Sequence, residues 1–324
     1  MPSAAHYKIQ GTPSTNIHQA CVAPGAIVPC KICGTAAKYI LSLDSAVDPP
    51  LLDIFSCPEC GLLFVGNPIT NEQLTFAYNS ADTGRYYQEI ALATDQKMAA
   101  ALHDLGPLLS RSGGNSSLLD VGCGHGHFLE ALAGSYPHVR AAGHELPGES
   151  AEVCRKKNLR VFTGALDEIP ERFTIVSLLD VAEHVPWPTD FFTACYALLD
   201  TSGYIYLHTP RKCFWDGLFI ALAGIPGFRR LAVTWLRTRV SIFHLHLWSD
   251  KALRLSLQKA GFEIEDYRQE TELSWPVRQY VEVYLGKRLS RVSWLMSLAG
   301  GVADILFVKL GTLKNKAVCR GVKR

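Results

Sequence analysis

Apolar segments alternate with amphipathic segments through the middle of the chain. Apolar runs with the length of buried strands occur at 118–121, 139–143, 159–162, 173–179 and 204–208. Apolar residues at helical spacing occur between or before them at 91–109, 128–132 and 191–199. Alternating strands and helices are typical of a parallel sheet that helices cover on both faces. The pattern predicts an α/β fold that binds its ligand beyond the carboxyl ends of the strands.

The first 70 residues have a different pattern. Residues 1–28 contain Lys8 as their only charged side chain and no unbroken apolar run, so we expect a flexible leader rather than a secretory signal. Short apolar segments at 38–43 and 62–65 predict strands of a small module at 29–70. The large α/β domain is then expected to occupy residues 71–324.

Composition and charge limit the functions that this fold can have. Hydrophobic residues make up 48% of the 324 residues and the formal net charge is only +2. A protein that holds nucleic acid normally carries a stronger positive field, so nucleic acid is a disfavoured partner. Six of the ten cysteines are scattered, which is typical of a reducing compartment and predicts a cytoplasmic protein. No run reaches the roughly 18 uncharged apolar residues of a spanning helix.

Four cysteines form two identical motifs in the small module. Cys30-Lys-Ile-Cys33 and Cys57-Pro-Glu-Cys60 each enclose two residues and each precedes a glycine. Two such turns supply the four thiolates of a tetrahedral Zn²⁺ site, which has no open position for catalysis. The sequence therefore predicts a structural zinc ribbon. Thiol pairs without metal, or a redox pair, are the alternative.

A glycine-rich turn follows the first strand of the large domain. Gly122, Gly124 and Gly126 separate the run at 118–121 from the next helical segment, and glycines there let the backbone approach a bound nucleoside. The second strand ends at Glu145, at the distance where Rossmann-like folds place a carboxylate for the ribose. A nicotinamide-binding turn is the alternative to this interpretation.

Two motifs carry a resemblance to a known family. Leu119-Asp-Val-Gly-Cys-Gly-His-Gly126 resembles the first motif of class I S-adenosylmethionine-dependent methyltransferases, and Asp180-Val-Ala-Glu-His-Val185 resembles their motif after the fourth strand. Residues 198–210 and 244–262 resemble later segments of the same family. With the cysteine module included, the chain resembles zinc-ribbon methyltransferases associated with bacterial glycan biosynthesis. The resemblance implies a Rossmann-like, seven-stranded, mostly parallel sheet with flanking helices, preceded by the ribbon.

The resemblance also implies a cofactor, S-adenosyl-L-methionine, and a set of residues that hold it. The glycine turn is expected to surround the methionine moiety, Asp120 to support the turn or the amino group, and Glu145 to accept hydrogen bonds from the ribose. Adenine is expected beside the third strand. The complete expected cofactor set is Asp120, Gly122, Cys123, Gly124, Gly126, Glu145, Ala165, Leu166 and Asp180.

The candidate catalytic residues follow the fourth strand. A hydroxyl acceptor must lose a proton, and His184 stands where the methyl group is expected to point. Glu183 is expected to orient the imidazole or to contact the cofactor. A structural hydrogen bond for His184 and a solvated carboxylate for Glu183 are the alternatives. His244 and His246 alternate in sequence and are either a second base, a metal pair or packed histidines.

Two aromatic-rich insertions, near 211–243 and 271–300, are expected to form lids over an acceptor pocket, with ordinary core helices as the alternative. A final strand is expected at 304–310. The basic residues beyond it suggest a solvent-exposed tail, with peripheral contact to the inner face of the membrane as a further hypothesis.

These features favour a methyltransferase that acts on an O or C atom of a small molecule, a sugar or a lipid-linked glycan. An RNA methyltransferase is one alternative, because zinc ribbons often hold nucleic acid, but the low net charge disfavours it. A non-catalytic, zinc-dependent scaffold that binds a nucleoside is the other. The sequence gives no prediction of the oligomeric state.

Overall fold

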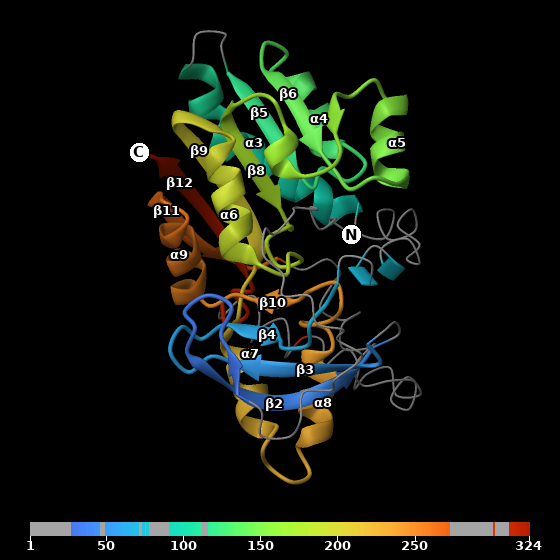
Figure 1. The fold of residues 1–324 in the computed structure, drawn as a ribbon, viewed down its shortest axis with the longest axis vertical. Helices are drawn as coiled ribbons and strands as arrows, with labels where there is room; N and C mark the ends of the chain where they lie inside the picture. Colours follow the sequence, from blue (N-terminus) through green and yellow to red (C-terminus); the bar gives the residue numbers. More distant parts are fainter. Residues whose placement is uncertain are drawn as a thin grey trace.

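The computed structural model describes residues 27–45, 49–70, 73–74, 76–77, 91–111, 116–272, 301 and 311–324. Within these ranges the chain forms two β-sheets, one of seven strands and one of five, which lie one above the other in Figure 1. Most of the leader at 1–28, most of the insertion at 271–300 and the strand expected at 304–310 lie outside the described residues.

The seven-stranded sheet is mostly parallel. Its order is β11-β12-β9-β8-β5-β6-β7, and all neighbours pair in parallel except at β12, which is antiparallel to both β9 and β11. The prediction of an α/β fold with a mostly parallel sheet of seven strands is confirmed for the described residues. The strands are β5 (Ser117–Val121), β6 (Arg140–His144), β7 (Val161–Phe162), β8 (Phe173–Leu179), β9 (Leu199–Pro210), β11 (Phe262–Glu270) and β12 (Lys316–Lys323).

Helices cover both faces of this sheet, because successive strand residues point to opposite sides. In β5, Leu118 belongs to an apolar cluster with α3 and α4, whereas Leu119 belongs to a cluster with α6 and α9. Both leucines are fully buried, which explains why the central strands are nearly continuous apolar runs. The helices around the sheet are α3 (Ala91–Arg111), α4 (His127–Ser135), α5 (Glu149–Lys156), α6 (Pro188–Ala197) and α9 (Asp250–Lys259).

The basic end of the chain is part of the sheet core. The expectation of a solvent-exposed tail is wrong, because residues 316–323 form β12 between β9 and β11. Val318, Cys319 and Val322 are at most 1% exposed, and burial of these apolar side chains favours the strand. Its first lysine, Lys316, is paired with the partly buried carboxylate of Asp180. Its last lysine, Lys323, donates to two backbone carbonyls.

The five-stranded sheet combines the cysteine module with a strand from much later in the chain. Its order is β1-β2-β3-β4-β10, and all described pairs are antiparallel. Strand β10 comes from the segment that precedes α9, so the module shares a sheet with the large domain. The strands are β1 (Val28–Pro29), β2 (Ala36–Asp44), β3 (Leu51–Ser56), β4 (Leu63–Val65) and β10 (His246–Leu247).

The insertion near 211–243 packs on this second sheet. It forms α7 (Phe214–Leu222) and α8 (Arg229–Leu236), which lie beside the five-stranded sheet and far from β5 and α4 in Figure 1. Ala232 and Leu236 share an apolar cluster with Leu41 and Ile54 of the module. The expected lid therefore serves as a second layer of the small sheet, since its apolar residues complete that core. No helix in the described ranges has the length and apolar character needed to cross a membrane.

Candidate active site and zinc centre

The glycine turn after β5 has the backbone conformation that the sequence predicts. The backbone φ angles of Gly122, Gly124 and Gly126 are 72°, 54° and 78°, values that residues other than glycine rarely adopt. The amides of Gly122 and Cys123 donate to the carbonyl of His144, at 2.8 and 3.1 Å. The turn is therefore fastened to the end of β6, and α4 begins directly after it.

Glu145 joins the same turn from the neighbouring strand. Its Oε2 accepts from the Gly124 amide at 2.8 Å and its Oε1 accepts from the Leu146 amide at 2.7 Å. The residue is 1% exposed. No sequence pattern singles out Gly143, yet a Cβ there would lie 2.5 Å from Cys123 Sγ, so glycine lets the turn pack against β6. Cys123 itself is buried behind the turn.

Asp120 lies in β5 beneath the turn. Its Oδ1 accepts from the Ser177 hydroxyl at 2.7 Å, and no sequence pattern predicts this hydrogen bond. Burial raises the pKa of Asp120 to about 7, against the opposing effect of the Ser177 hydrogen bond. The carboxyl group therefore gains or loses its charge near neutral pH, and its position suits support of the turn.

The expected adenine contacts lie beside Glu145. Ala165 and Leu166 stand at the start of a 3₁₀ turn after β7, which is the parallel neighbour of β6. His144 Nε2 lies 3.0 Å from the Gly164 carbonyl and links the two strand ends. Leu166 is fully buried in the core and Ala165 is 7% exposed, so the two residues offer little surface to a ligand there.

Asp180 belongs to a partly buried ionic cluster at the end of β8. Its φ angle is +56°, and its carboxylate contacts Lys97 Nζ at 2.6 Å, Lys316 Nζ at 2.7 Å and His208 Nδ1 at 3.0 Å. Glu272 completes the cluster, 3.2 Å from His208 Nε2. Both oxygens of Asp180 are thus occupied by protein cations, and its expected contact with the cofactor stays a prediction.

The charges in this cluster stabilise one another. Burial alone would raise the pKa of Asp180, but Lys316 and Lys97 hold it well below its usual value. Burial likewise opposes ionisation of Glu272, yet Lys316 and His208 lower its pKa to about 2. Burial would lower the pKa of His208, but Asp180 keeps it raised. Sequence reasoning could not find Lys97, because it lies 83 residues before its partner.

Glu183 and His184 follow one turn later and face a third residue, His244. His184 Nε2 lies 3.4 Å from Glu183 Oε1, and the His184 and His244 rings are in an edge-to-face contact at 5.0 Å between centroids. Glu183 is completely buried, and its Oε2 accepts from the Thr209 hydroxyl at 2.9 Å. Burial and the neighbouring His184 lower the pKa of His244 to about 4, so its ring is neutral at pH 7.

His246 lies close to this group through its backbone. Its amide donates to the Glu183 carbonyl at 3.1 Å, and its fully buried ring packs against Trp248 at 5.8 Å. Strand β10 therefore connects the catalytic candidates with the cysteine module. The predicted alternation of His244 and His246 brings only His244 into side-chain contact with His184.

Among the residues that the structure describes, two groups of side chains have the chemistry to hold a metal ion. Glu183, His184 and His244 each bring one ligand atom within 4.8 Å of the others. The four cysteine sulfurs meet the same limit, with Cys30–Cys60 and Cys33–Cys57 contacts of 3.5 and 3.4 Å. A tetrahedral Zn²⁺ shell with Zn–S distances of about 2.3 Å would place its sulfurs about 3.8 Å apart.

The backbone around the cysteines also fits a zinc centre. The residue after each motif, Gly34 and Gly61, has a φ angle of 78° or 77°, as a tight turn requires. Amide groups point at two sulfurs: Ile32 donates to Cys30 Sγ and Cys60 donates to Cys57 Sγ, at 3.5 and 3.4 Å. Such donors stabilise thiolates, so the donor set fits Zn²⁺.

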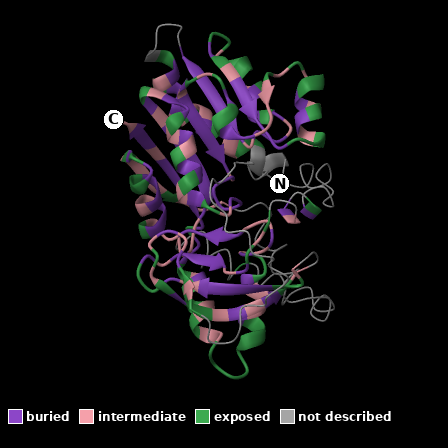
Figure 2. Ribbon diagram, viewed as in Figure 1, coloured by how far each residue is buried: buried purple, intermediate pink, exposed green. Residues whose placement is uncertain are grey.

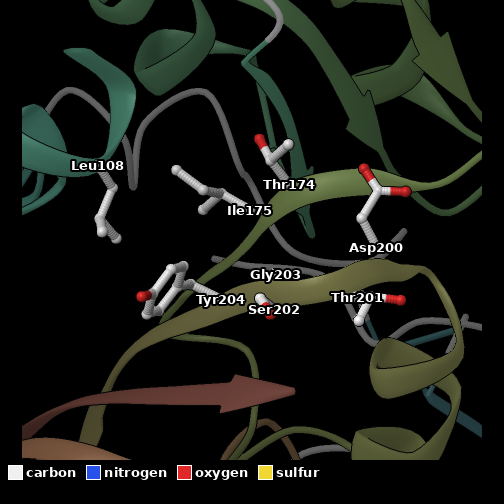
Figure 3. Close-up of a pocket in the computed structure, with 8 residues that line it drawn as sticks. All are labelled: Leu108, Thr174, Ile175, Asp200, Thr201, Ser202, Gly203 and Tyr204. Atoms are coloured by element: carbon white, nitrogen blue, oxygen red, sulfur yellow. The ribbon is translucent and has the colours of Figure 1, made fainter. Parts of the chain in front are cut away.

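A separate pocket lies at the amino-terminal ends of β8 and β9 in the seven-stranded sheet. Figure 3 shows its lining from the first residues of β8 and β9 and the end of α3, including Thr174, Asp200 and Leu108. Ligands of parallel sheets bind at the carboxyl ends of the strands, where Gly122, Glu145 and His184 gather. The pocket in Figure 3 is therefore distinct from the candidate active site.

Known proteins are similar to parts of this chain. Ubiquinone biosynthesis O-methyltransferases of Pseudomonas putida (strain W619) and Pseudomonas entomophila (strain L48) are 31% and 32% identical, over 34% of this chain and 54% of each relative. The chain thus spans about half the length of these curated relatives. A SAM dependent methyltransferase from Archaeoglobus fulgidus is 18% identical with a TM-score of 0.42, covering 70% of this chain and 94% of that one. A mycolic acid cyclopropane synthase is 19% identical with a TM-score of 0.43, covering 64% and 77%.

A protein family described as "Methyltransferase domain" matches residues 89–267, which is more than half of the chain. The match includes the glycine turn, Glu145 and the Glu183-His184 pair. The protein therefore belongs to this methyltransferase domain family.

Proposed function

We propose that the protein transfers a methyl group from S-adenosyl-L-methionine to a hydroxyl oxygen of a small-molecule, sugar or lipid-linked glycan acceptor. The observation that carries the proposal is the hydrogen bond from the Gly124 amide to the buried Glu145 carboxylate. It joins the glycine turn and the candidate ribose carboxylate in one rigid unit. Membership in the methyltransferase domain family supports the same cofactor.

Two further facts bear on the acceptor. The two curated relatives described above are named as O-methyltransferases, which supports oxygen over carbon as the methylated atom. The sugar or lipid-linked class has narrower support, namely the resemblance of the ribbon-containing chain to methyltransferases associated with glycan biosynthesis. Within the class of hydroxyl acceptors, a small molecule and a glycan are to be tested side by side.

The residues at the carboxyl end of β8 suit the proton transfer that a hydroxyl acceptor needs. The cofactor, when bound, supplies an electrophilic methyl group on sulfur. His184 would accept the acceptor's proton, and the Glu183 carboxylate, 3.4 Å from its Nε2, would stabilise the imidazolium that forms. The neutral His244 ring packs against His184 and helps to fix its orientation. Glu183 and His184 are buried away from bulk water, which strengthens these electrostatic effects, whereas His244 is partly exposed.

The small module is proposed to be a structural zinc ribbon. Cys30, Cys33, Cys57 and Cys60 would fill all four positions around Zn²⁺, so the metal would stabilise the fold and take no part in the reaction. Three of these cysteines are at most 4% exposed and contribute to the main apolar cluster. The ribbon would therefore hold β4, and with it β10, against the large domain.

Cofactor binding is the first experiment. Calorimetry is expected to show binding of both S-adenosylmethionine and its demethylated product, because the ribose contact is common to the two. Glu145→Ala is expected to weaken both by about 1.5–3 kcal/mol, the value of a hydrogen bond to a charged group. Glu152→Ala, which removes an exposed carboxylate from α5, is the matched control and should leave both affinities unchanged.

Three outcomes would contradict the proposal. A folded wild-type protein that binds neither ligand would exclude a functional cofactor site. Unchanged affinity in a folded Glu145→Ala variant would move the ribose away from β6. Binding without turnover on any panel of hydroxylated acceptors would favour the non-catalytic scaffold instead.

A further inference from the structure

Exposed apolar side chains gather on the hairpin formed by α7, its connecting loop and α8, residues 214–236. Half of the large exposed hydrophobic residues in the described ranges belong to it, with exposures between 37% and 66%. Burial of such side chains is favourable, so a cluster of them at one place marks an interaction surface. They are Phe214, Leu218, Ile225, Phe228 and Leu231.

The exposure does not arise from a loosely packed hairpin. Asp216 is completely buried and ties the two helices together: it accepts from the Cys213 amide at 2.8 Å, from Trp235 Nε1 at 2.7 Å and from Arg239 Nε at 3.0 Å. Phe219 stacks on Trp235 at 4.9 Å. The inner face is thus fixed on the five-stranded sheet, while the outer face and the loop remain apolar and exposed.

The charged side chains of the loop and of α8 all have one sign. Residues 217–249 contain no aspartate or glutamate, and residues 217–228 contain no charged side chain at all. Arg229 and Arg230 follow at the start of α8, both exposed and without an ion pair to a described residue. An apolar loop flanked by arginines has the character of an amphipathic element at the surface of an anionic bilayer.

The hairpin also has a suitable position. In Figure 1, α7, α8 and their loop form the end of the molecule farthest from the seven-stranded sheet, and Figure 2 shows that this end is exposed. A projecting tip can enter a lipid interface without displacing the rest of the protein. The two lysines of β12 are poorly placed for this purpose, because Lys316 pairs with Asp180 and Lys323 donates to backbone carbonyls.

We propose that the tip of the α7–α8 hairpin, residues 218–231, inserts into the headgroup region of a bilayer that contains anionic lipids. A second copy of this chain is a poorer occupant. A twofold contact centred on the tip would bring Arg229 and Arg230 close to the same two residues of the other copy, and like charges that face each other oppose association. The proposal is independent of the methyl-transfer chemistry, because it uses none of the candidate catalytic or cofactor residues.

Vesicle sedimentation with the zinc-loaded full-length protein tests the proposal. Binding is expected to vesicles of phosphatidylcholine with a quarter phosphatidylglycerol, and to fall at least tenfold on pure phosphatidylcholine, because each arginine near an anionic surface contributes about a fivefold factor. Phe228→Asp/Leu231→Asp is expected to lower binding to anionic vesicles at least tenfold, since both apolar side chains would lose their contact with lipid. Arg229→Glu/Arg230→Glu is expected to lower it at least tenfold as well.

Matched controls separate a local contact from a general property. Phe76→Asp exchanges a phenylalanine outside the hairpin that is more exposed than Phe228, at 62% against 46%, and Arg155→Glu/Lys156→Glu makes the same charge change at the end of α5. Both should bind vesicles like the wild type, and all variants should keep the wild-type circular dichroism spectrum. Equal binding by hairpin variants and controls would overturn the proposal, as would failure of the wild type to bind anionic vesicles. A dimer in sedimentation velocity that Phe228→Asp/Leu231→Asp dissolves, without vesicle binding, would identify a second copy as the occupant.

Discussion

Two clusters of titratable side chains lie at the carboxyl end of β8, one around Asp180 and one around Glu183. They differ in how completely their charges are paired. Around Asp180, two lysines and a histidine neutralise the carboxylates, and every charge has a partner. Around Glu183, one imidazole 3.4 Å from Oε1 is the nearest group that can carry a positive charge. A balanced cluster stabilises the fold, whereas an incompletely balanced one retains the capacity to act on a ligand.

The cysteine cluster extends this comparison and carries the largest expected effect. Structural zinc contributes about 10–16 kcal/mol of apparent binding free energy in small modules. Elemental analysis is expected to find one zinc per chain, and a strong chelator to unfold the five-stranded sheet, measured by loss of near-ultraviolet dichroism. Cys57→Ser/Cys60→Ser should abolish zinc retention, while Cys195→Ala outside the cluster should preserve it. Metal-free yet folded wild-type protein would refute the zinc assignment.

Removing one charge from the balanced cluster is expected to have the next largest effect. Asp180→Asn keeps a residue type that tolerates the observed φ of +56° but leaves Lys97 and Lys316 without their shared partner. Breaking a buried ion pair from one side costs about 3–5 kcal/mol. Urea denaturation measures this loss of unfolding free energy. A loss below about 1 kcal/mol would show that the cluster contributes little to stability.

The same cluster predicts how stability changes with pH. The pKa of Glu272 is depressed to about 2, so its contribution is present above the unfolded value near 4.5 and is lost as the pH falls through the folded one. The pKa of His208 is raised, so its contribution is present below about 6.5 and is lost as the pH rises. The cluster's contribution should be greatest between about pH 4.5 and 6.5.

Comparison of variants isolates this effect from other carboxylates. The denaturation midpoint of the wild type, measured from pH 3 to 9, should exceed that of Asp180→Asn most strongly between pH 4.5 and 6.5. His208→Gln should remove the decline on the alkaline side. A difference between wild type and Asp180→Asn that is constant across the range would contradict the assigned charges.

The smallest expected effect belongs to the incompletely balanced cluster. Glu183→Gln preserves the size of the side chain and the acceptor for the Thr209 hydroxyl, so the unfolding free energy should change by less than about 1.5 kcal/mol. The same urea denaturation that is used for Asp180→Asn gives this value. A loss as large as that of Asp180→Asn would mean that the two clusters do not differ in kind.

The sequence predicted the elements whose signals are local. Glycines at 122, 124 and 126 after an apolar run identified the turn, and the apolar run of β8 was placed at its exact bounds. Paired cysteines identified the four sulfurs that meet in space. These features depend on residues close together in sequence, where periodicity and spacing carry the information.

Contacts between distant segments could not be predicted. Lys97 and Lys316 reach Asp180 from 83 and 136 residues away, and neither position has a pattern that reveals a buried partner. The two-residue strand β10 is too short for a periodic signal. The basic residues of β12 led to its interpretation as a solvent-exposed tail. The insertion near 211–243 was assigned to a lid because its apolar residues do not indicate which surface they cover.

The most direct test of the account is the rate of methyl transfer by His184→Ala in a single turnover. The acceptor is to be taken from a panel of hydroxylated small molecules, sugars and lipid-linked glycans. His138→Ala, which removes an exposed histidine, is the matched control. A base acts in the transition state, so the rate should fall by about 10²–10⁴-fold while calorimetry shows unchanged affinity for S-adenosylmethionine. A near-normal rate in folded His184→Ala would contradict the account and leave His244 as the next candidate.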